Sequence, residues 1–387
     1  MSTKKYLKTT LIAALCTAAI ANTAWAQTVK LGYSGPLSGG GALYGKNALS
    51  GIEMAIDEIN ASGGYSICGK KYNFQVIALD DKYAPSETGI NARRLVQEHK
   101  TPIIFTPHAG GTFAMQVFNE KEGFLIASYT SVPDVSERGN TLTVRIPPNF
   151  KNYIEPFSKY AMKRFGTKVA VANANHTYAK MWTEAFTEGW KKLGGTVVAE
   201  NPMDYNRDTD FYSGVSRVLA AKPDVLFIGG PSEPTALVAQ QAREQGFKGG
   251  FIVMDQAKLD EMAKIVGGLQ PLEGSVGVMP LVFNDAPAAK AFIRAYEEKY
   301  GKTPTTEASL NRYATYVFAE AMNQSCSVDD ARKIREAIPK AVAALPPELN
   351  TDGVEGVEEN GAFLLELRFA VVENGQIVVK RRGDLLN

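Results

Sequence analysis

Strand-like and helix-like patterns alternate along this chain from about residue 29 onward. Residues 29–34 are rich in β-favouring side chains and end in a Gly-Pro turn, which predicts a strand. Small and apolar residues then recur at three- and four-residue spacing from Gly51 to Ile59, which predicts the buried face of a helix. In the same stretch of chain we expect strands at 74–79, 103–105 and 124–127, and helices at 86–98 and 113–120.

The pattern restarts near residues 145–149. Apolar strand segments without alternation are typical of strands covered on both faces, as in parallel sheets, and their alternation with helices predicts an α/β architecture. In this second unit we expect helices at 153–165, 177–193, 211–221 and 234–245, and strands at 168–172, 196–199, 224–228 and 251–253.

The last hundred residues break this rhythm. Two long helices are expected at 286–300 and 309–323. Asn374-Gly375 then lies between two β-rich runs, 361–372 and 376–379, and an Asn-Gly pair in that context predicts a hairpin.

The first 26 residues have the three parts of a secretory signal peptide. Three lysines precede an apolar run at 11–21, and Ala24-Trp25-Ala26 supplies the small residues that a signal peptidase reads. The apolar run is about half the length of a membrane-spanning helix. Leu15 stands before Cys16, where a lipid-attachment site requires a small residue. We therefore expect a mature chain that begins near Gln27 and works outside the cytoplasm, in the periplasm.

The composition of the mature chain limits the possible partners. Removing 26 residues from 387 leaves 361, a length suited to two domains. The signal carries three of the 42 basic residues and none of the 41 acidic ones, so the remainder has a formal charge of −2. A near-neutral chain without a basic block argues against nucleic acid as a partner.

Cysteine and histidine are sparse. Cys68 and Cys326 are the two cysteines of the mature chain, and an oxidising compartment permits a disulfide between them. Their spacing alone cannot place them together, and we favour two buried thiols over a bond. His99, His108 and His176 lack the spacing of a metal site, so we expect no metal and no cofactor.

A glycine-rich loop at residues 38–45 follows the first strand. Gly39 and Gly41 match the start of a dinucleotide-binding loop, but Tyr44 occupies the position of its third glycine. A bulky residue there blocks close helix–strand packing, which argues against nucleotide binding. The sequence also lacks a P-loop, a G-x-S-x-G, an HExxH and a C-x-x-C pattern.

Three strand ends carry candidate ligand-binding residues, because ligands of open α/β sheets bind beyond the carboxyl ends of strands. After the strand at 103–105, the loop containing His108, Gly110, Gly111 and Thr112 has backbone N–H groups suited to an anion. The alternative is a loop that only turns the chain. Residues 128–131 follow the next strand and offer hydroxyl groups and one aromatic ring to a ligand. The alternative is that they are solvated turn residues. Asp255 follows the strand at 251–253 and either pairs with a ligand ammonium or caps the next helix.

Several motifs resemble those of periplasmic solute-binding proteins of ABC importers, of the branched-chain amino acid (Leu/Ile/Val) type. No one of these motifs is specific alone, but they follow the family's order along nearly the whole mature chain. They are LGYSGPLSG (31–39) with YG (44–45), SGIEMAIDEINASGG (50–64), LDD (79–81), VPDVSERGNTLTVR (132–145), SRVLAAKPDVLFIGG (216–230) and EGSVGVMPL (273–281).

The resemblance implies the type I periplasmic binding protein fold, in which two doubly wound, Rossmann-like α/β lobes are joined by three hinge crossovers. The crossovers are expected at 145–150, 278–282 and 353–361. The first lobe would then contain 27–148 and 280–355, and the second lobe 149–279 and 356–387. The implied function is non-catalytic: a monomer captures a small-molecule ligand and delivers it to an ABC permease in the inner membrane.

The resemblance also implies ligand-binding positions. Tyr44 matches an aromatic wall, Tyr129 and Ser131 match carboxylate ligands, and Tyr178 matches an aromatic residue of the second lobe. Pro231 and Ser232 stand where the family often has aromatic residues, and Asp255 stands where amino-acid binders place an acid for the ammonium.

One position departs from the family's amino-acid binders. Gly110-Gly111 replaces a serine cluster whose hydroxyl grips the ligand carboxylate, and Thr112 or backbone N–H groups would have to substitute. Tyr129 is also bulkier than the residue expected there. An amino acid is the leading ligand, with an aromatic carboxylate or an amide-like solute as alternatives. An exported enzyme and a receptor-linked sensor are the competing functions.

Overall fold

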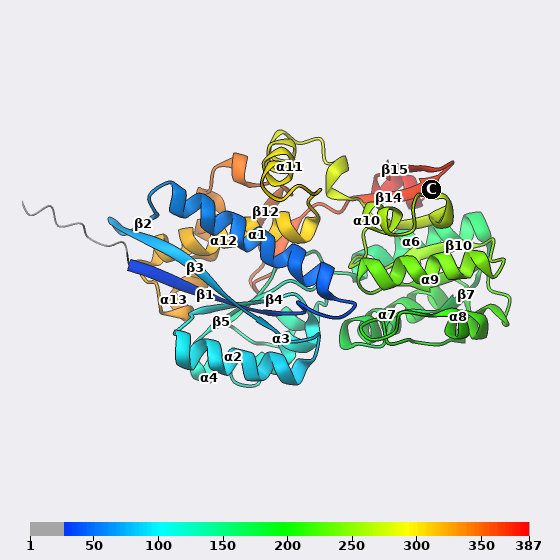
Figure 1. Cartoon of the computed structure of the whole chain (residues 1–387), viewed down its shortest axis with the longest axis horizontal. Coiled ribbons are helices and arrows are strands. Elements are labelled where there is room, and N and C mark those ends of the chain that lie inside the picture. The colour runs from blue at the N-terminus through cyan, green and yellow to red at the C-terminus, as the bar shows by residue number, and fades with distance from the viewer. Residues whose placement is uncertain (1–26, 387) are drawn as a thin grey trace, which may run out of the picture.

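The computed structural model describes residues 27–386 and contains two β-sheets flanked by helices, one in each of two lobes (Figure 1). The predicted export signal, residues 1–26, lies outside the described part of the chain. Within residues 27–386, no helix has both the length and the apolar character needed to cross a membrane.

The first lobe is built on a six-stranded sheet with the order β2-β3-β1-β4-β5-β6. Its neighbouring strands are parallel except for β2 and β3. The strands are β1 (Gln27–Gly35), β2 (Tyr65–Ile67), β3 (Lys70–Asp80), β4 (Ile103–Thr106), β5 (Leu125–Ser128) and β6 (Thr143–Arg145). The helices are α1 (Ala42–Ala61), α2 (Pro85–His99), α3 (Ala109–Gln116), α4 (Asn119–Glu122), α5 (Asp134–Glu137), α11 (Pro287–Tyr300), α12 (Thr306–Ser325) and α13 (Ala331–Ala344).

The apolar run of β4 shows why this sheet is covered on both faces. Ile103 and Phe105 belong to the core that α1, α12 and α13 share with the sheet, whereas Ile104 packs into a second core with α2 and α3. Successive strand residues point to opposite faces, so a strand without polar alternation requires helices on both sides. The prediction of parallel strands covered on both faces is therefore confirmed for this sheet.

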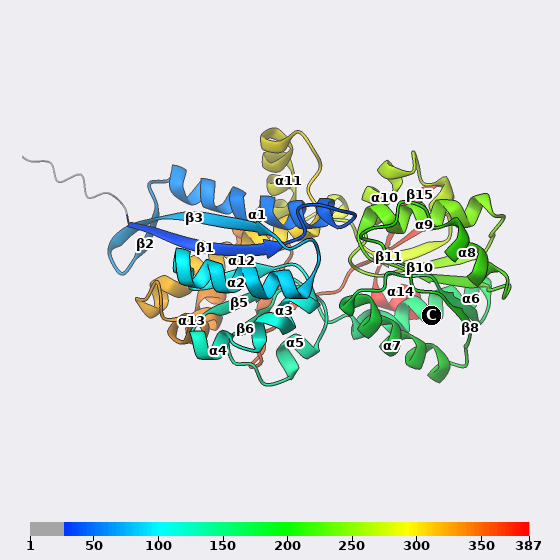
Figure 2. The same cartoon turned by 60° about the horizontal axis from the view of Figure 1, so that its bottom comes forward.

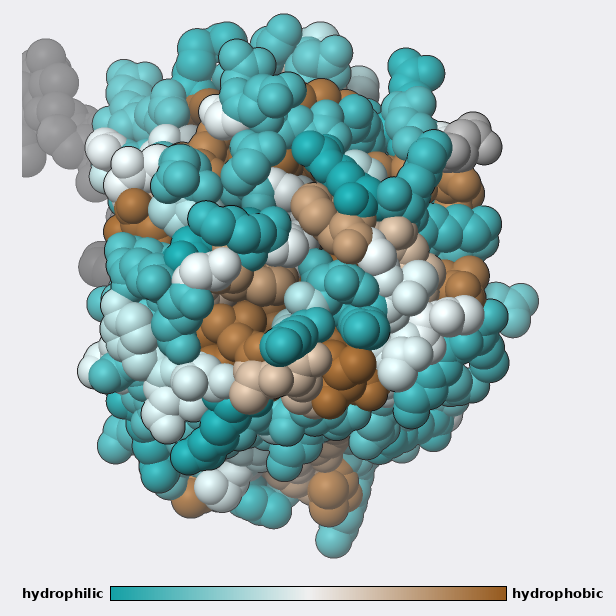
Figure 3. All heavy atoms as spheres, turned by 90° about the vertical axis from the view of Figure 1, so that its right-hand side faces the viewer, coloured by the Kyte–Doolittle hydropathy of each residue, from teal (hydrophilic) through white to brown (hydrophobic). Residues whose placement is uncertain are grey.

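The second lobe is built on a seven-stranded sheet with the order β15-β14-β11-β10-β9-β7-β8, parallel except at β14 and β15. Figure 3 shows the outer end of this lobe, where hydrophilic residues surround several hydrophobic ones. The strands are β7 (Lys168–Val171), β8 (Thr196–Glu200), β9 (Val225–Ile228), β10 (Gly250–Val253), β11 (Ser275–Val278), β14 (Phe369–Glu373) and β15 (Gln376–Lys380). The helices are α6 (Lys151–Phe165), α7 (Thr177–Lys192), α8 (Tyr212–Leu219), α9 (Ser232–Glu244), α10 (Leu259–Ile265) and α14 (Arg382–Leu386).

Three connections join the lobes, and the third differs from its expected position. They lie between β6 and α6, between β11 and α11, and between β13 (Phe363–Leu365) and β14. β13 pairs with β12 (Val354–Val357), and Val354 and Phe363 pack into the core of the first lobe. The third connection is therefore at residues 366–368 rather than 353–361. On these cores, we propose that the first lobe extends to residue 365 instead of 355.

The sequence patterns miss several elements, of which α13 is the longest, and merge two strands. α13 has buried Ile334, Ile338 and Ala341 at helical spacing, although Pro339 lies inside it. The hairpin at Asn374-Gly375 is confirmed, with Glu373 paired to Gln376. Its first arm begins at Phe369, because the earlier part of the predicted run belongs to β13 in the first lobe.

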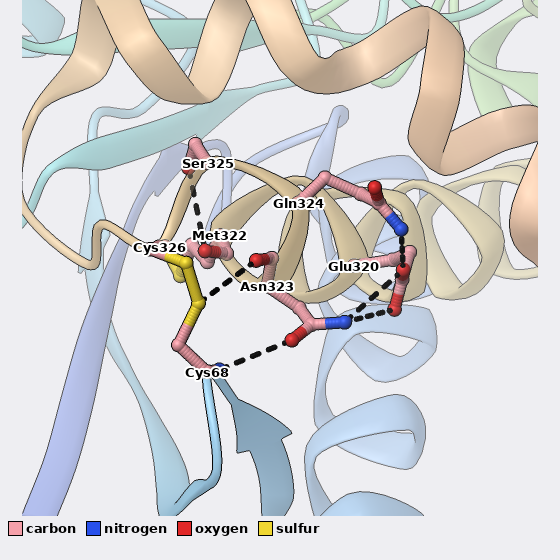
Figure 4. Close-up of a disulfide and its surroundings, with 7 residues drawn as sticks. All are labelled: Cys68, Glu320, Met322, Asn323, Gln324, Ser325 and Cys326. Atoms are coloured by element: carbon pink, nitrogen blue, oxygen red, sulfur yellow. Dashed lines mark hydrogen bonds between the residues drawn. A yellow bond between two sulfur atoms is a disulfide. The ribbon is translucent and has the colours of Figure 1, made fainter.

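A disulfide joins Cys68 to Cys326, with 5.4 Å between the Cα atoms. Cys68 lies in the turn between β2 and β3, and Cys326 directly follows α12 (Figure 4). The Cys68 backbone N–H also donates to Asn323 Oδ1 at 3.1 Å. Both cysteines are exposed, so the expectation of two buried thiols is wrong. The fold brings together two residues whose distance along the chain carries no such information.

The disulfide is expected to stabilise the first lobe without affecting ligand binding. Replacing both cysteines by serine should lower the free energy of unfolding by about 2–5 kcal/mol, because a long loop of the unfolded chain loses its constraint. Thermal unfolding with and without reductant measures the effect. Reductant should lower the melting temperature of the wild type and leave the double variant unchanged. Equal melting temperatures for the reduced and oxidised wild type would contradict the prediction.

Candidate ligand-binding site

A small cavity of about 230 Å³ lies between the lobes, beyond the carboxyl ends of β5 and β10. Figure 2 shows β1, which is parallel to β4, pointing toward the second lobe. The walls come from the loops after β5, β6 and β10 and from the first turns of α1, α7 and α12. They are formed by Tyr44, Tyr129, Thr130, Ser131, Pro147 and Glu307 of the first lobe, and by Tyr178, Asp255 and Gln256 of the second.

Four residues of this cavity hold a buried polar atom that has no hydrogen-bond partner within residues 27–386. They are Thr130 Oγ1, Ser131 Oγ, Gln256 Oε1 and Glu307 Oε2. A buried polar group without a partner costs about 1–3 kcal/mol. Four such atoms around one cavity indicate a polar ligand that completes their hydrogen bonds when the lobes are closed.

Asp255 is held in the wall of the cavity by two donors of α7. The Tyr178 hydroxyl donates to Asp255 Oδ1, and Trp182 Nε1 donates to the same oxygen at 2.9 Å. Burial, and next the charge of Asp255, raises the pKa of Tyr178 well above its usual value, so the phenol keeps its proton. The next helix, α10, begins after Lys258 without a side-chain cap. Asp255 therefore does not cap α10, which was the alternative to ligand binding in the sequence analysis.

The charges at the cavity leave a negative excess. Asp255 and Glu307 line it as carboxylates, and Lys258 Nζ donates to Glu307 Oε1 at 2.6 Å. The side chains of this ion pair are only 5% and 2% exposed. One lysine thus faces two carboxylates, and a ligand cation near Asp255 would balance the charge, as buried charges require.

Five of the ten residues predicted from the sequence line this cavity: Tyr44, Tyr129, Ser131, Tyr178 and Asp255. The Tyr44 hydroxyl donates to the Tyr129 carbonyl at 3.3 Å. Thr130 belongs to the candidate segment 128–131, whereas Gln256 was missed although it adjoins Asp255. Glu307 was missed because it follows no strand, and its sequence neighbourhood carries no signal.

His108 fills the position where the sequence suggested an anion site. Its Nδ1 accepts the Gly111 backbone N–H at 3.0 Å, so Nε2 carries the proton and donates to Asp81 at 2.9 Å. The Thr112 hydroxyl is bonded to Ser128 at 2.6 Å, away from the cavity. These groups bind one another, and neither His108, Gly110, Gly111 nor Thr112 lines the cavity.

Gly110 and Ser232 do not line the cavity either, because Gly110 is closely packed and Ser232 forms hydrogen bonds within the second lobe. A Cβ on Gly110 would lie 2.7 Å from Pro85 Cγ and 3.2 Å from Thr177 Oγ1 of the second lobe. Ser232 donates to Glu261 Oε2 at 2.7 Å and accepts the Lys258 N–H at 3.0 Å. Both residues lie beside the closed interface between the lobes rather than in the wall of the cavity.

The glycine-rich loop makes a second contact between the lobes, through Gly40, which does not line the cavity. The Gly40 N–H donates to the Asn206 carbonyl at 3.0 Å, and Asn206 Nδ2 donates to the Lys82 carbonyl at 2.9 Å. A Cβ on Gly40 would collide with the Tyr205 carbonyl oxygen. The glycines of this loop therefore permit close backbone contact with the second lobe.

Tyr83 of the first lobe lies between two histidine rings. Its ring centroid is 4.7 Å from that of His108 in its own lobe and 4.7 Å from that of His176 in the second lobe, both stacked. Its hydroxyl accepts Gln256 Nε2 at 2.8 Å. Residues of both lobes thus surround this ring when the cleft is closed.

Two α/β lobes that close on a polar cavity define a two-lobed solute-binding protein. The sequence model of the periplasmic binding protein family matches residues 28–367. The chain therefore belongs to the periplasmic binding protein family, and the resemblance and the fold class predicted from the sequence are confirmed.

Among characterised relatives, the Leu/Ile/Val-binding protein BraC3 of Rhizobium johnstonii is 27% identical, covering 87% of this chain and 89% of the relative. The Leu/Ile/Val-binding protein of Escherichia coli K12 is 26% identical, covering 84% and 86%.

Solved structures share the fold. The leucine-binding protein LivK of Thermotoga maritima has a TM-score of 0.75 at 23% identity, covering 92% of this chain and 99% of that one. A Rhodopseudomonas palustris solute-binding protein in complex with benzoate has a TM-score of 0.76 at 15% identity, covering 91% and 95%.

Gly40→Ala is expected to hinder closure without unfolding either lobe. The added methyl group meets the Tyr205 carbonyl only when the lobes are together, so the closed form alone is destabilised. Small-angle scattering with bound solute should give a larger radius of gyration than for the wild type. Gly89→Ala is the matched control, because its Cβ would meet only Ala114 Cβ at 4.0 Å. Equal radii for all three proteins would contradict this role of the loop.

Acid is expected to weaken closure through His176. Burial, and then the nearby His108, lowers the pKa of His176 to about 3, whereas an exposed histidine has a pKa of about 6.5. The closed form therefore requires the neutral ring, and its stability is complete above pH 6.5 and falls as the pH drops below it. A drop from pH 7 to pH 5 should weaken solute binding by roughly 25-fold through His176.

The variant His176→Asn isolates this contribution, since asparagine also caps the start of α7, as His176 does by accepting the Ala179 N–H. Burial raises the pKa of Glu261 to about 7, which gives a pH dependence of opposite sign in both proteins. The difference between wild type and variant, measured by titration calorimetry from pH 5 to 8, reports His176 alone. Parallel pH profiles would exclude His176 as the sensitive group.

Proposed function

We propose that this protein is the substrate-binding component of an ABC importer and that it captures an amino acid between its lobes. The observation that carries the proposal is the division of the unpartnered polar atoms into two kinds. Thr130 and Ser131 offer hydroxyl donors on one lobe, and Gln256 Oε1 and Glu307 Oε2 offer acceptors. A zwitterion satisfies both kinds, with its carboxylate at the hydroxyls and its ammonium at the acceptors and Asp255.

The charge of the site favours an amino acid over the alternative of an aromatic carboxylate. A carboxylate alone would bring a third negative charge to Asp255 and Glu307, against the single Lys258. An ammonium group close to Asp255 offsets that excess. The names of the relatives, which describe binders of leucine, isoleucine and valine, agree with this choice. An amide-like solute satisfies the acceptors but places no positive charge beside Asp255.

Closure would transmit the presence of the ligand. A ligand that contacts both lobes binds the closed form more tightly than the open one and shifts the population toward it. We infer that a permease of the inner membrane recognises this closed form, after export of the chain to the periplasm and removal of residues 1–26. We assign the protein no reaction, since the cavity's polar groups suit the two ends of one ligand. A sensor that presents the same closed form to a receptor is the second candidate.

Asp255→Asn should abolish most of the amino-acid affinity. Asparagine keeps an oxygen for Tyr178 and Trp182 but replaces the other carboxylate oxygen by an amide donor that repels an ammonium. Removal of one partner from a buried charge pair costs about 2–5 kcal/mol, so a roughly 100-fold loss is expected. Asp208→Asn, an exposed acid on the same lobe, should bind like the wild type.

The measurement is titration calorimetry on protein that has been unfolded and refolded to remove carried ligand, after a thermal-shift screen of amino acids, aromatic carboxylates and amides. A ligand at 100 times its Kd adds about 2.7 kcal/mol of stability. Stabilisation only by aromatic acids would retain solute binding and exclude the amino acid. Unchanged affinity in Asp255→Asn would exclude the ammonium contact, and turnover of any ligand in mass spectrometry would overturn the non-catalytic assignment.

A further inference from the structure

A second cavity adjoins the ligand site on the side of the connections between the lobes. Tyr129, Pro147 and Asp255 line both cavities, so the two spaces share a wall. The second space measures about 610 Å³, including the part open to solvent, against about 230 Å³ for the first. We call it the hinge cavity, because residues of all three connections line it, among them Pro148, Met279 and Arg368.

The walls of the hinge cavity include both apolar and polar residues. Val278, Leu281 and Leu310 contribute apolar surface. The polar residues include Asp352 and Arg368, and Arg368 Nη1 donates to Asn284 Oδ1 at 3.0 Å. A ligand side chain with methylene groups and a polar end would contact both kinds of surface.

Asp352 lines the hinge cavity with a carboxylate oxygen that lacks a hydrogen-bond partner in the described part of the chain. Its Oδ2 is buried and accepts no hydrogen bond from residues 27–386. Burial raises the pKa of this carboxyl to about 7, with a smaller contribution from the charge of Glu307, whereas an interaction with the Ser309 hydroxyl and then the charge of Arg368 act in the opposite direction. Near neutral pH the group can accept a hydrogen bond as a carboxylate or donate one as an acid.

We propose that the hinge cavity receives the side chain of the bound amino acid and selects a side chain ending in a carboxamide or ureide. This inference rests on the proposed amino-acid function. A distal carboxylate would be attracted by Arg368 but repelled by Asp352 and by Glu366, which also lines the cavity, and a distal cation would experience the reverse. A neutral group with an N–H donor and a carbonyl acceptor satisfies Arg368 and Asp352 without adding charge.

The test compares glutamine and citrulline with norleucine, which has an unbranched side chain but no polar end. Titration calorimetry on refolded protein should show glutamine or citrulline binding at least tenfold more tightly than norleucine, because a site that hydrogen-bonds a polar group rejects the analogue lacking it. Asparagine, which is one methylene shorter than glutamine, should bind more weakly than glutamine. Lysine and glutamate report whether a charged end is preferred, and preference for either overturns the proposal.

Two variants assign the preference to the hinge cavity. Asp352→Ala and Arg368→Met should each reduce the preference for glutamine over norleucine by roughly tenfold and leave norleucine affinity within a factor of about three. Asp352→Asn, which keeps a donor and an acceptor, should retain the preference. Equal losses for both ligands in both substituted proteins would make these residues structural and overturn the proposal. Melting temperatures without ligand identify any variant that fails to fold.

The outcomes separate this inference from the function on which it rests. If no amino acid binds the refolded wild type, the proposed function fails. If leucine or norleucine binds as tightly as glutamine and citrulline, the amino-acid function stands and the assignment of the hinge cavity fails.

Discussion

The buried ion pair between Lys258 and Glu307 connects ligand binding to closure of the lobes. Lys258 belongs to the second lobe and Glu307 to the first, and both side chains are almost fully buried where they meet. Taking two charges out of water is costly, and their attraction offsets the cost only when their remaining hydrogen bonds are also satisfied. Lys258 donates in addition to the Asp255 and Gln256 carbonyls, whereas Glu307 Oε2 has no partner within residues 27–386. The proposed ligand would supply the missing partner.

Closure therefore depends on two sets of contacts with different requirements. At the ligand cavity, unpartnered polar atoms make the empty closed form costly. At the glycine-rich loop and around Tyr83, the lobes contact each other directly, through Asn206 and His176. These direct contacts hold the lobes in register but need no solute. The balance between them makes closure responsive to ligand, because a protein that closed fully on its own contacts would gain nothing from binding.

The sequence predicted the architecture better than it predicted the site. Parallel strands have apolar runs and helices have periodic apolar faces, and both signals are local. Residues directly after strand ends were likewise found, as with Ser131 and Asp255. Glu307 lies at the start of a helix far along the chain, and only the return of the chain to the first lobe brings it to the cavity. The disulfide was misjudged for the same reason, since nothing local places Cys68 beside the end of α12.

The departure at Gly110 has a physical explanation in the structure. A side chain there would press against Pro85 and Thr177, so this position serves close packing of α3 against the start of α7. The neighbouring Gly111 N–H donates to His108 Nδ1. The missing side chain at Gly110 and this hydrogen bond both remove an anion contact from the start of α3. In the proposed site, recognition of the carboxylate falls to the hydroxyls of Thr130 and Ser131, beyond the next strand. This arrangement would place the proposed ligand nearer the connections between the lobes, beside the hinge cavity.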